Sequence, residues 1–317
     1  MTQSVLILGA GGRFGRHATT AFTQTGWEVR TPPRGPAGVD IFDPASVTQA
    51  ARGVDVIVNA LNPAYPDWAR DVPRLTQSVI TAAEATGALV IVPGNIYPYG
   101  AGMPPLLTST TAHAPTTRKG QIRTDMEEAY RASNARCLIL RAGDFLDVKD
   151  SGNWFESHIA KAAPKGRFAY PGPTDQPHAW AFLPDMARAA EALAAQAHTL
   201  PRFADVPFPG YTLTGEELRT AVEHVLGHPV RHTGFPWRML RLMALVSPLM
   251  REVLEMRYLW NVPHQLDATP LQELLPTFKH TPLEGALRTS LSPHSSVTST
   301  QTSRWSEAAS RPSPSSS

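Results

Sequence analysis

A short apolar run followed at once by glycines, VLILGAGGRFGRH at residues 5–17, constrains this chain more than any other feature. The apolar residues predict a buried strand, and a helix is expected to begin near Arg13. Glycine recurs at every third position of the intervening turn, where it permits backbone conformations barred to other residues and leaves room for a pyrophosphate. The free N–H groups of the helix start would face a phosphate. A glycine-rich connection without a ligand is the alternative, but the position between strand and helix favours a dinucleotide. The predicted cofactor contacts in this turn are Gly9, Gly12, Arg13, Phe14 and Gly15.

Strand-like and helix-like segments alternate through the first half of the chain. The predicted strands lie at 4–8, 28–30, 54–59, 89–92 and 136–140, and the predicted helices lie at 14–25, 45–51, 72–85 and 120–132. This alternation predicts an α/β fold, a Rossmann-type doubly wound parallel sheet at residues 1–146. Prolines and aromatics then become frequent, so residues 147–291 are expected to form a smaller C-terminal substrate lobe, interleaved with the sheet. Residues 292–317 are rich in Ser, Thr and Pro, which predicts a disordered tail.

The composition excludes several classes of protein. With 317 residues, 42% of them hydrophobic, the chain can bury a sizeable core, and a net charge of +2 gives no argument for nucleic acid. Cys137 is the only cysteine, so no disulfide framework is possible. The histidines His113, His158 and His178 are far apart in sequence, and no metal site is predicted. Without a signal-peptide pattern or an apolar run long enough to span a membrane, a cytoplasmic protein is expected.

Several motifs in order resemble the extended short-chain dehydrogenase/reductase family, in its epimerase/dehydratase-like branch. They are GAGGRFG, VDIFDPAS, IVNALNP, NIYPYG, LILRAGDF, AFLPDMARA and YTLTGEELRTAVEHVLG, and they span residues 5–231. The resemblance implies a nicotinamide dinucleotide, with Asp43 near the adenine. The segment IVNALNP resembles the family's fourth strand and the loop beside the cofactor, which places Asn59, Ala60 and Leu61 there.

The sequence departs from this family at the catalytic pair, a tyrosine four residues before a lysine. There the lysine lowers the tyrosine's pKa so that it can exchange protons near neutrality. If Arg123 replaces the lysine, then Lys119 occupies the tyrosine position; if Lys119 is the lysine, that position is Pro115. The usual serine is also missing, since Gly94 and Asn95 fill its place. The candidate catalytic residues are therefore Lys119, Tyr97 and Arg123, with Lys119 alternatively a ribose anchor or a solvated charge.

Positive charge around the nucleotide turn favours NADP(H), although NAD(H) is possible. Cofactors without the 2′-phosphate usually meet a carboxylate after the second strand, and here that segment reads WEVRTPPRG. Arg13, Arg30 and Arg34 could grip a phosphate dianion. The alternative is that Arg30 and Arg34 are solvated surface charges.

Two further features carry more than one interpretation. Asp144 and His178 are candidate acid–base groups, but a capping aspartate and a packed histidine are the more common roles of such residues. The segment at 235–260 is rich in Met, Leu and Arg, and packing onto the lobe is favoured over contact with a membrane surface.

The sequence thus predicts an NAD(P)-binding oxidoreductase or epimerase-like protein acting on a small, partly apolar substrate, with a homodimer possible. The alternative is a catalytically inactive NADP(H)-sensing regulator or scaffold, because the usual tyrosine and serine are absent.

Overall fold

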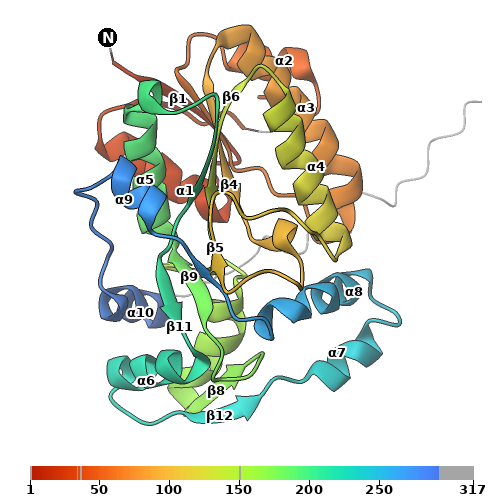
Figure 1. The fold of residues 1–317 in the computed structure, drawn as a ribbon, viewed down its shortest axis with the longest axis vertical. Coiled ribbons are helices and arrows are strands. Elements are labelled where there is room, and N and C mark those ends of the chain that lie inside the picture. Colours follow the sequence, from red (N-terminus) through yellow and green to blue (C-terminus); the bar gives the residue numbers. More distant parts are fainter. Residues whose placement is uncertain (1, 34, 36–37, 150, 293–317) are drawn as a thin grey trace, which may run out of the picture.

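The computed structural model describes residues 2–33, 35, 38–149 and 151–292 (Figure 1). Arg34 and the predicted tail beyond Ser292 lie outside the described residues.

A six-stranded parallel sheet forms the centre of the molecule, so the predicted α/β fold is confirmed. In spatial order the strands are β10 (Phe203–Pro207), β6 (Arg136–Arg141), β4 (Leu89–Gly94), β3 (Val56–Asn59), β1 (Ser4–Leu8) and β2 (Glu28–Arg30). Five of these strands were predicted. The predicted bounds of β1 and β2 match the structure, and those of β3, β4 and β6 agree to within two residues, whereas β10 was not predicted. The inner strands are apolar except at their ends, because both faces of a parallel sheet are covered.

Helices cover the two faces of the sheet (Figure 1). On one face α1 (Arg13–Gln24) packs beside α5 (Leu183–Ala195), and their apolar sides share a core with β1 and β6. On the other face lie α2 (Pro44–Ala50), α3 (Trp68–Thr86) and α4 (Arg118–Ala132). The helix α3 ends at Gly87, whose φ of 75° lets the chain leave the last turn in the left-handed conformation.

A smaller group of elements lies beyond the carboxyl ends of the strands. It contains a sheet of β7 (Asp144–Leu146), β9 (His178–Phe182) and β11 (Tyr211–Leu213), and a two-stranded pairing of β8 (Arg167–Tyr170) with β12 (Arg231–Gly234). Its helices are α6 (Gly215–Leu226), α7 (Trp237–Met243), α8 (Pro248–Glu255) and α10 (Leu283–Leu291). A short pair, β5 (Leu106–Leu107) with β13 (Gln265–Leu266), and the helix α9 (Thr269–Leu274) run back along the sheet. None of the helices in the described ranges is long and apolar enough to cross a membrane.

The strand order places the site. From β1 the chain moves to β2 on one side and later to β3 on the other, so the loops after β1 and β3 diverge. Open α/β sheets bind ligands in the crevice that such a reversal creates. The smaller group of elements lies below this edge in Figure 1.

Candidate active site

The glycine turn after β1 is tightly packed on one side and open on the other. Gly9 has a φ of +83°, and a Cβ there would lie 2.8 Å from the carbonyl oxygen of Ala60. A Cβ on Gly15 would lie 2.2 Å from the Gly9 carbonyl oxygen, so the helix can approach the turn only with glycine there. Gly11, by contrast, faces open space, and no side chain of the described residues caps the start of α1 at Gly12. The turn therefore fits a diphosphate held by backbone N–H groups.

The two remaining turn residues are held by the protein itself. Phe14 is buried in the core beneath α1, so only its backbone can face a ligand. Arg13 donates from Nε to the carbonyl oxygen of Ser151 at 2.8 Å and from Nη2 to that of Gly152 at 3.0 Å. These bonds bring the loop after β7 against the start of α1. Arg13 thus ties that loop to the nucleotide turn.

A buried carboxylate strengthens the same connection. Asp147 is fully buried, forms an ion pair with Arg16, and accepts a hydrogen bond from His17 at 2.8 Å. Burial opposes ionisation, but the bonds from His17, Arg16 and Ser151 together hold the pKa of Asp147 below its usual value. The loop after β7 is therefore anchored to α1 by charge as well as by backbone contacts.

At the end of β2, only part of the Arg30 guanidinium group is hydrogen-bonded. Its Nε donates to Glu28 at 2.9 Å and its Nη1 to the carbonyl oxygen of Arg52 at 2.8 Å, while the side chain remains 38% exposed. Because Arg30 is in register with Leu6 of β1, it lies beside the strand that leads into the glycine turn.

The segment before α2 holds two aspartates with different surroundings. Both carboxylate oxygens of Asp43 accept backbone N–H groups at the start of α2, each at 3.1 Å. Asp43 is thus the N-cap of that helix. Asp40 is exposed and uses only Oδ1, which accepts the N–H of Phe42 at 3.0 Å. Of the two, Asp40 has the freer carboxylate.

The loop after β3 forms the other wall of the crevice. Asn59 is 7% exposed and donates from its side-chain amide to the Tyr130 hydroxyl at 3.0 Å. Ala60 donates its N–H to Leu8 at 3.0 Å, which fixes this loop against the end of β1. Leu61 is packed in the core on the α3 side. The asparagine therefore holds the loop in place, while the backbone of Ala60 lies against Gly9.

The start of α4 decides which residues occupy the family's catalytic positions. The helix begins at Arg118, so Lys119 and Arg123 both lie on it, one turn apart, whereas Pro115 precedes it. Only the alignment of Lys119 with the tyrosine and Arg123 with the lysine keeps both positions on the helix. A serine at position 94 is also excluded locally, because a Cβ on Gly94 would lie 2.6 Å from a methyl carbon of Ile139.

Lys119 is 1% exposed and belongs to an ion-pair group with α8. Its Nζ contacts Glu252 and lies 2.7 Å from Glu255, whose other oxygen accepts the Lys119 backbone N–H at 3.0 Å. The same Nζ lies 5.0 Å from the ring centroid of Tyr65. These contacts make Lys119 the anchor that holds α8 to α4.

Arg123 is a buried cation without a carboxylate in direct contact among the described residues. It donates to the Asn62 side chain at 3.2 Å and stacks over the Trp68 ring at 4.4 Å, and its Nε is buried with no hydrogen-bond partner there. Burial lowers the pKa of Arg123 from its usual value. A buried guanidinium with an unused donor is suited to an anionic or hydroxyl-bearing ligand.

Tyr97 stands at the loop after β4, next to these groups. Its hydroxyl lies 3.1 Å from the hydroxyl of Tyr65, and its backbone N–H donates to Asn95. Asn95, at the position of the missing serine, thus shapes the turn that presents Tyr97. Burial, followed by the neighbouring Tyr65 and Asp144, raises the pKa of Tyr97 well above its usual value. Tyr97 is therefore a protonated hydroxyl at neutral pH.

Asp144 and His178 form a hydrogen-bonded pair on neighbouring strands. The Asp144 Oδ2 atom lies 2.7 Å from His178 Nε2, and the His178 ring stacks on Trp260 at 4.4 Å. His178 is 3% exposed, whereas the Asp144 side chain is 22% exposed. The histidine is packed, and the aspartate is the member of the pair that can reach a ligand.

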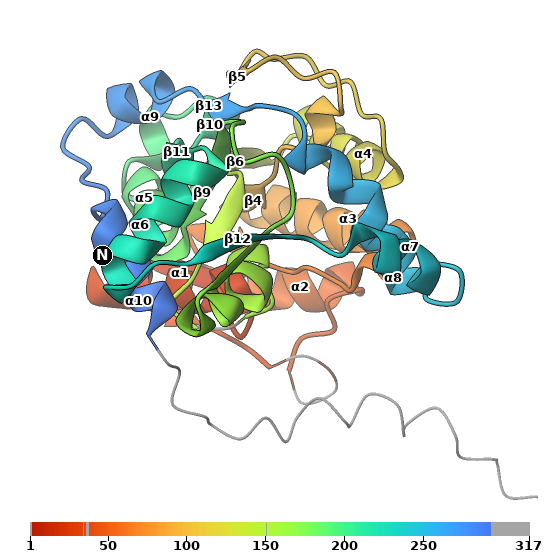
Figure 2. The ribbon, with the colours of Figure 1, turned by 90° about the horizontal axis from the view of Figure 1, so that it is seen from below.

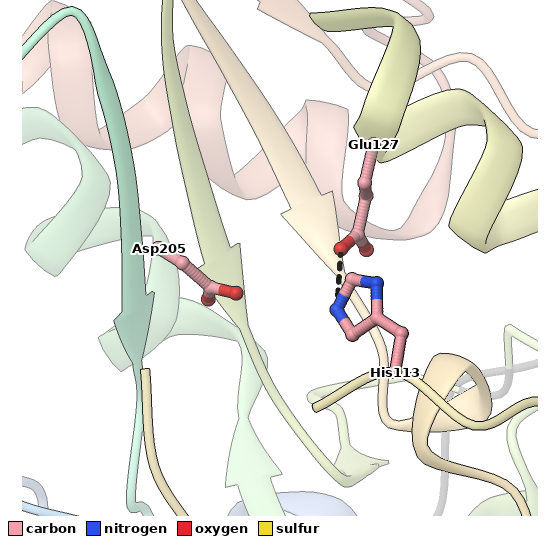
Figure 3. Close-up of side chains that lie close together, drawn as sticks. All are labelled: His113, Glu127 and Asp205. Carbon is pink, nitrogen blue, oxygen red and sulfur yellow. Dashed lines mark ion pairs between the residues drawn. The ribbon is translucent and has the colours of Figure 1, made fainter. Parts of the chain in front are cut away.

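Figure 3 shows three potential metal ligands, His113, Glu127 and Asp205, which come from separate elements. One ligand atom of each lies within 4.8 Å of the others. The guanidinium of Arg141 already binds both carboxylates, at 2.7 Å to Glu127 and 2.5 Å to Asp205. Arg141 is fully buried and also donates to the Asn95 carbonyl oxygen at 2.6 Å. A cation would have to displace this guanidinium, so the group fits a structural ion-pair network better than a metal site.

Sequence reasoning missed several of these relationships. Tyr65, Glu252 and Glu255 gave no local signal, since Glu255 is 136 residues from the lysine it contacts. Asp40 lies three residues before the predicted Asp43 in the same motif. The sequence does not distinguish these two aspartates, and only the structure shows that Asp43 caps α2.

Comparisons with known proteins identify the fold. No protein-family profile matches the sequence, and no curated protein matches it either. Solved structures match over nearly the whole chain. A proposed epimerase from Burkholderia cenocepacia has a TM-score of 0.71 at 17% identity, covering 92% of this chain and 97% of its own. RMD from Pseudomonas aeruginosa, solved with NADPH, has a TM-score of 0.67 at 15% identity, covering 92% and 97%.

A third structure extends the comparison to the other nicotinamide cofactor. The UDP-glucose 4-epimerase from Bifidobacterium longum, solved with NAD⁺ and UDP, has a TM-score of 0.66 at 14% identity, covering 91% of this chain and 97% of its own. At such identities the likeness establishes architecture alone. The chain has the Rossmann-type fold of the nucleoside-diphosphate-sugar epimerases, that is, of the extended short-chain dehydrogenase/reductases.

Proposed function

We propose that this chain is an NADP(H)-dependent oxidoreductase or epimerase-like enzyme acting on a small, partly apolar substrate. The observation that carries the proposal is the Tyr97 hydroxyl, which stands beside the buried cation Arg123 at the carboxyl edge of a nucleotide-binding type of sheet. Neighbouring folds bound to NAD⁺ or NADPH support a nicotinamide cofactor.

The residues present fit such a cofactor. The backbone of Gly9, Gly12, Arg13, Phe14 and Gly15 would hold the diphosphate, because the turn is open on that side at Gly11. The loop of Asn59, Ala60 and Leu61 would line the opposite wall. Asp40, rather than the capping Asp43, has a carboxylate oxygen left for the adenine amine. When bound, the nicotinamide would supply or accept a hydride.

The preference for NADP(H) depends on positive charge at the adenosine end. The bonds of Arg30 to Glu28 and Arg52 use its Nε and Nη1 atoms and leave Nη2 out, and the side chain is partly exposed. Guanidinium groups bind phosphate dianions through paired, charge-assisted hydrogen bonds. Arg34, which lies outside the described residues, is kept from the sequence as a second such group.

The proton chemistry would run through Tyr97. A phenol kept protonated by burial can donate to a substrate oxygen as that oxygen gains charge during reduction. Tyr65 hydrogen-bonds the same hydroxyl and would help to orient it. Asp144 is the other partly exposed acid–base group here, oriented by His178. Lys119 would have a positioning role and would not exchange protons itself, because its Nζ is held by two carboxylates of α8.

Nicotinamide binding and turnover can be separated experimentally. Calorimetric titration with NADPH and NADH should show binding, tighter for NADPH. NADPH oxidation should then be followed over a panel of carbonyl compounds. Epimerisation consumes no NADPH overall, so it should be followed by chromatography of the products from a panel of nucleotide sugars, a class chosen because several structural neighbours are nucleoside-diphosphate-sugar epimerases. Turnover of any of these substrates supports the enzyme. Binding without turnover would favour an NADP(H)-sensing regulator, which the absence of a tyrosine at position 119 also suggests. No binding would overturn both.

A further inference from the structure

The helical hairpin of α7 and α8 projects from one side of the molecule, and Figures 1 and 2 both show it at the edge. Its inner side packs on the protein. Trp237 is buried, and it lies 6.0 Å from Trp154 and 4.8 Å from Phe235 between ring centroids. On α8 both glutamates turn inward to Lys119. The hairpin is therefore a fixed part of the fold whose outer side faces solvent.

The outer side of the hairpin is strongly apolar. Leu242 is 70% exposed, Leu245 79% and Val246 86%. Across the described ranges, the only large apolar side chain exposed elsewhere is Leu106. The apolar tip is defined as the six exposed residues Met239, Leu242, Met243, Leu245, Val246 and Leu249. Apolar side chains gathered in one surface patch mark a site of interaction. The sequence favoured packing of this segment, and only its inner side does pack.

The exposed charges around the apolar tip are all positive. Arg238, Arg241 and Arg251 are exposed on the hairpin and form no ion pair within the described part of the chain. The acidic residues of α8, Glu252 and Glu255, are occupied by Lys119. An apolar surface bordered by arginines is complementary to the interface of an anionic bilayer.

A hollow of about 380 Å³ lies beside the tip and carries more positive charge. It is lined by Phe235, Pro236, Trp237, Arg238, Arg241 and Arg257. The Arg257 guanidinium lies 5.2 Å from the Trp237 ring centroid, and its Nε is buried with no hydrogen-bond partner among the described residues. Three guanidiniums around a hollow, one of them with an unused buried donor, form a site for a phosphate group.

We propose that the hairpin docks on an anionic membrane surface, with the apolar tip inserted at the interface and a lipid phosphate bound among Arg238, Arg241 and Arg257. A second copy of the chain fits this surface less well, because a two-fold contact would bring the same arginines together. A bilayer containing phosphatidylserine satisfies both the apolar tip and the positive charge. The inference is independent of catalysis and of the proposed nucleotide binding.

Vesicle flotation tests this docking. The full-length protein should float with vesicles of phosphatidylcholine and phosphatidylserine, less so in high salt, and not with phosphatidylcholine alone. Replacing Leu245 and Val246 together by glutamate should lower the partition coefficient more than tenfold, because each apolar side chain contributes about tenfold when it leaves water. Arg238→Gln and Arg241→Gln should each lower it about fivefold.

The control is Leu106→Glu, the same change at an exposed leucine outside the hairpin, which should leave flotation unchanged. Three results would overturn the inference. One is an absence of flotation with the anionic vesicles. Another is complete release by millimolar inorganic phosphate, which would identify a free phosphate ligand. The third is a concentration-dependent dimer in light scattering that Leu245→Glu abolishes, because the tip would then be covered by a second copy.

Discussion

The hydroxyl oxygens of Tyr97 and Tyr65 lie 3.1 Å apart, although the two residues come from loops after different strands. Tyr65 precedes α3, and its ring lies over the ammonium group of Lys119 at 5.0 Å. A chain of contacts thus runs from α8 through Lys119 and Tyr65 to Tyr97. The Tyr97 hydroxyl is thus oriented by Tyr65, from the loop after β3. In the family that the sequence resembles, the tyrosine is instead activated by a lysine on its own helix.

Replacing Tyr97 by phenylalanine should abolish the proton transfer and leave the nucleotide site intact. General acid catalysis typically contributes about 10²–10⁴-fold, so kcat for the substrate found in the screen should fall by that order while the Kd for NADPH stays unchanged. Tyr211→Phe, a change of the same kind in the smaller group of elements, is the matched control. Full activity in Tyr97→Phe would remove this residue from the mechanism.

Arg30→Ala should discriminate between the two nicotinamide cofactors. The loss of a charge-assisted hydrogen bond to the 2′-phosphate should weaken NADPH by about 1.5–3 kcal/mol, and NADH should be almost unaffected. Calorimetric titration with each nucleotide measures both values. Arg52→Ala, which keeps the backbone carbonyl that Arg30 contacts, serves as a control for a general change in surface charge. An equal loss for both nucleotides would contradict a role in phosphate recognition.

Arg141→Met should destabilise the fold strongly. All five N–H donors of Arg141 are in use, and their loss leaves the buried carboxylates of Glu127 and Asp205 without a cation. Removing one partner of a buried ion pair costs about 3–5 kcal/mol, which chemical denaturation would show. Zinc should not raise the Tm of the wild-type protein, since the guanidinium occupies the carboxylates. A clear rise with zinc would instead assign His113, Glu127 and Asp205 to a metal.

Lys119→Met should loosen α8 without unfolding the sheet. The two glutamates of α8 would lose their cation, and being 17% and 21% exposed they can turn to water. Faster amide hydrogen exchange should therefore appear in α8 and leave β1, β3 and β4 protected. The exposed Lys161→Met is the control at a site outside this group. Unchanged exchange in α8 would show that the ion pairs do not hold the helix.

Glu156 should make stability depend on pH near neutrality. Burial raises its pKa to about 7, from a usual value of 4.5. The folded state therefore favours the protonated acid. The corresponding stability is fully present below about pH 4.5 and is lost as the pH rises through 7, by about 3 kcal/mol at most. Glu156→Gln should flatten the unfolding free energy between pH 5 and about pH 8. A wild-type curve as flat as that of the variant would contradict the raised pKa.

The sequence predicted the sheet well because each buried strand and each covering helix is encoded locally. The strands β1 and β2 were predicted at their observed bounds, since Gly9 directly follows the first and Gly26 lies just before the second. Hydrophobic patterning, however, does not report which distant charges meet. The carboxylates that pair with Lys119 lie 133 and 136 residues away in sequence, and Asp205 lies 64 residues from Arg141.

The candidate site was predicted only in part, because sequence patterns do not report long-range contacts. A glycine's need for close approach is visible in the sequence, and the packing at Gly9 and Gly15 agrees with it. Whether a side chain is free to bind a ligand is not visible in the sequence. Arg13 and Asp43 have the expected chemistry, but a loop carbonyl and a helix start take up much of their hydrogen-bonding capacity. Only the three-dimensional structure shows whether a hydrogen-bond donor or acceptor is free or already occupied.

Arg141 joins α4, β10 and the end of β4 through a single side chain, and this has an evolutionary consequence. Substitution of Glu127 or Asp205 alone by an apolar residue would leave two buried N–H donors of Arg141 without an acceptor. Descendants of this chain should therefore retain all three residues or exchange them as a set for apolar ones, and variants intermediate between those two solutions should be rare.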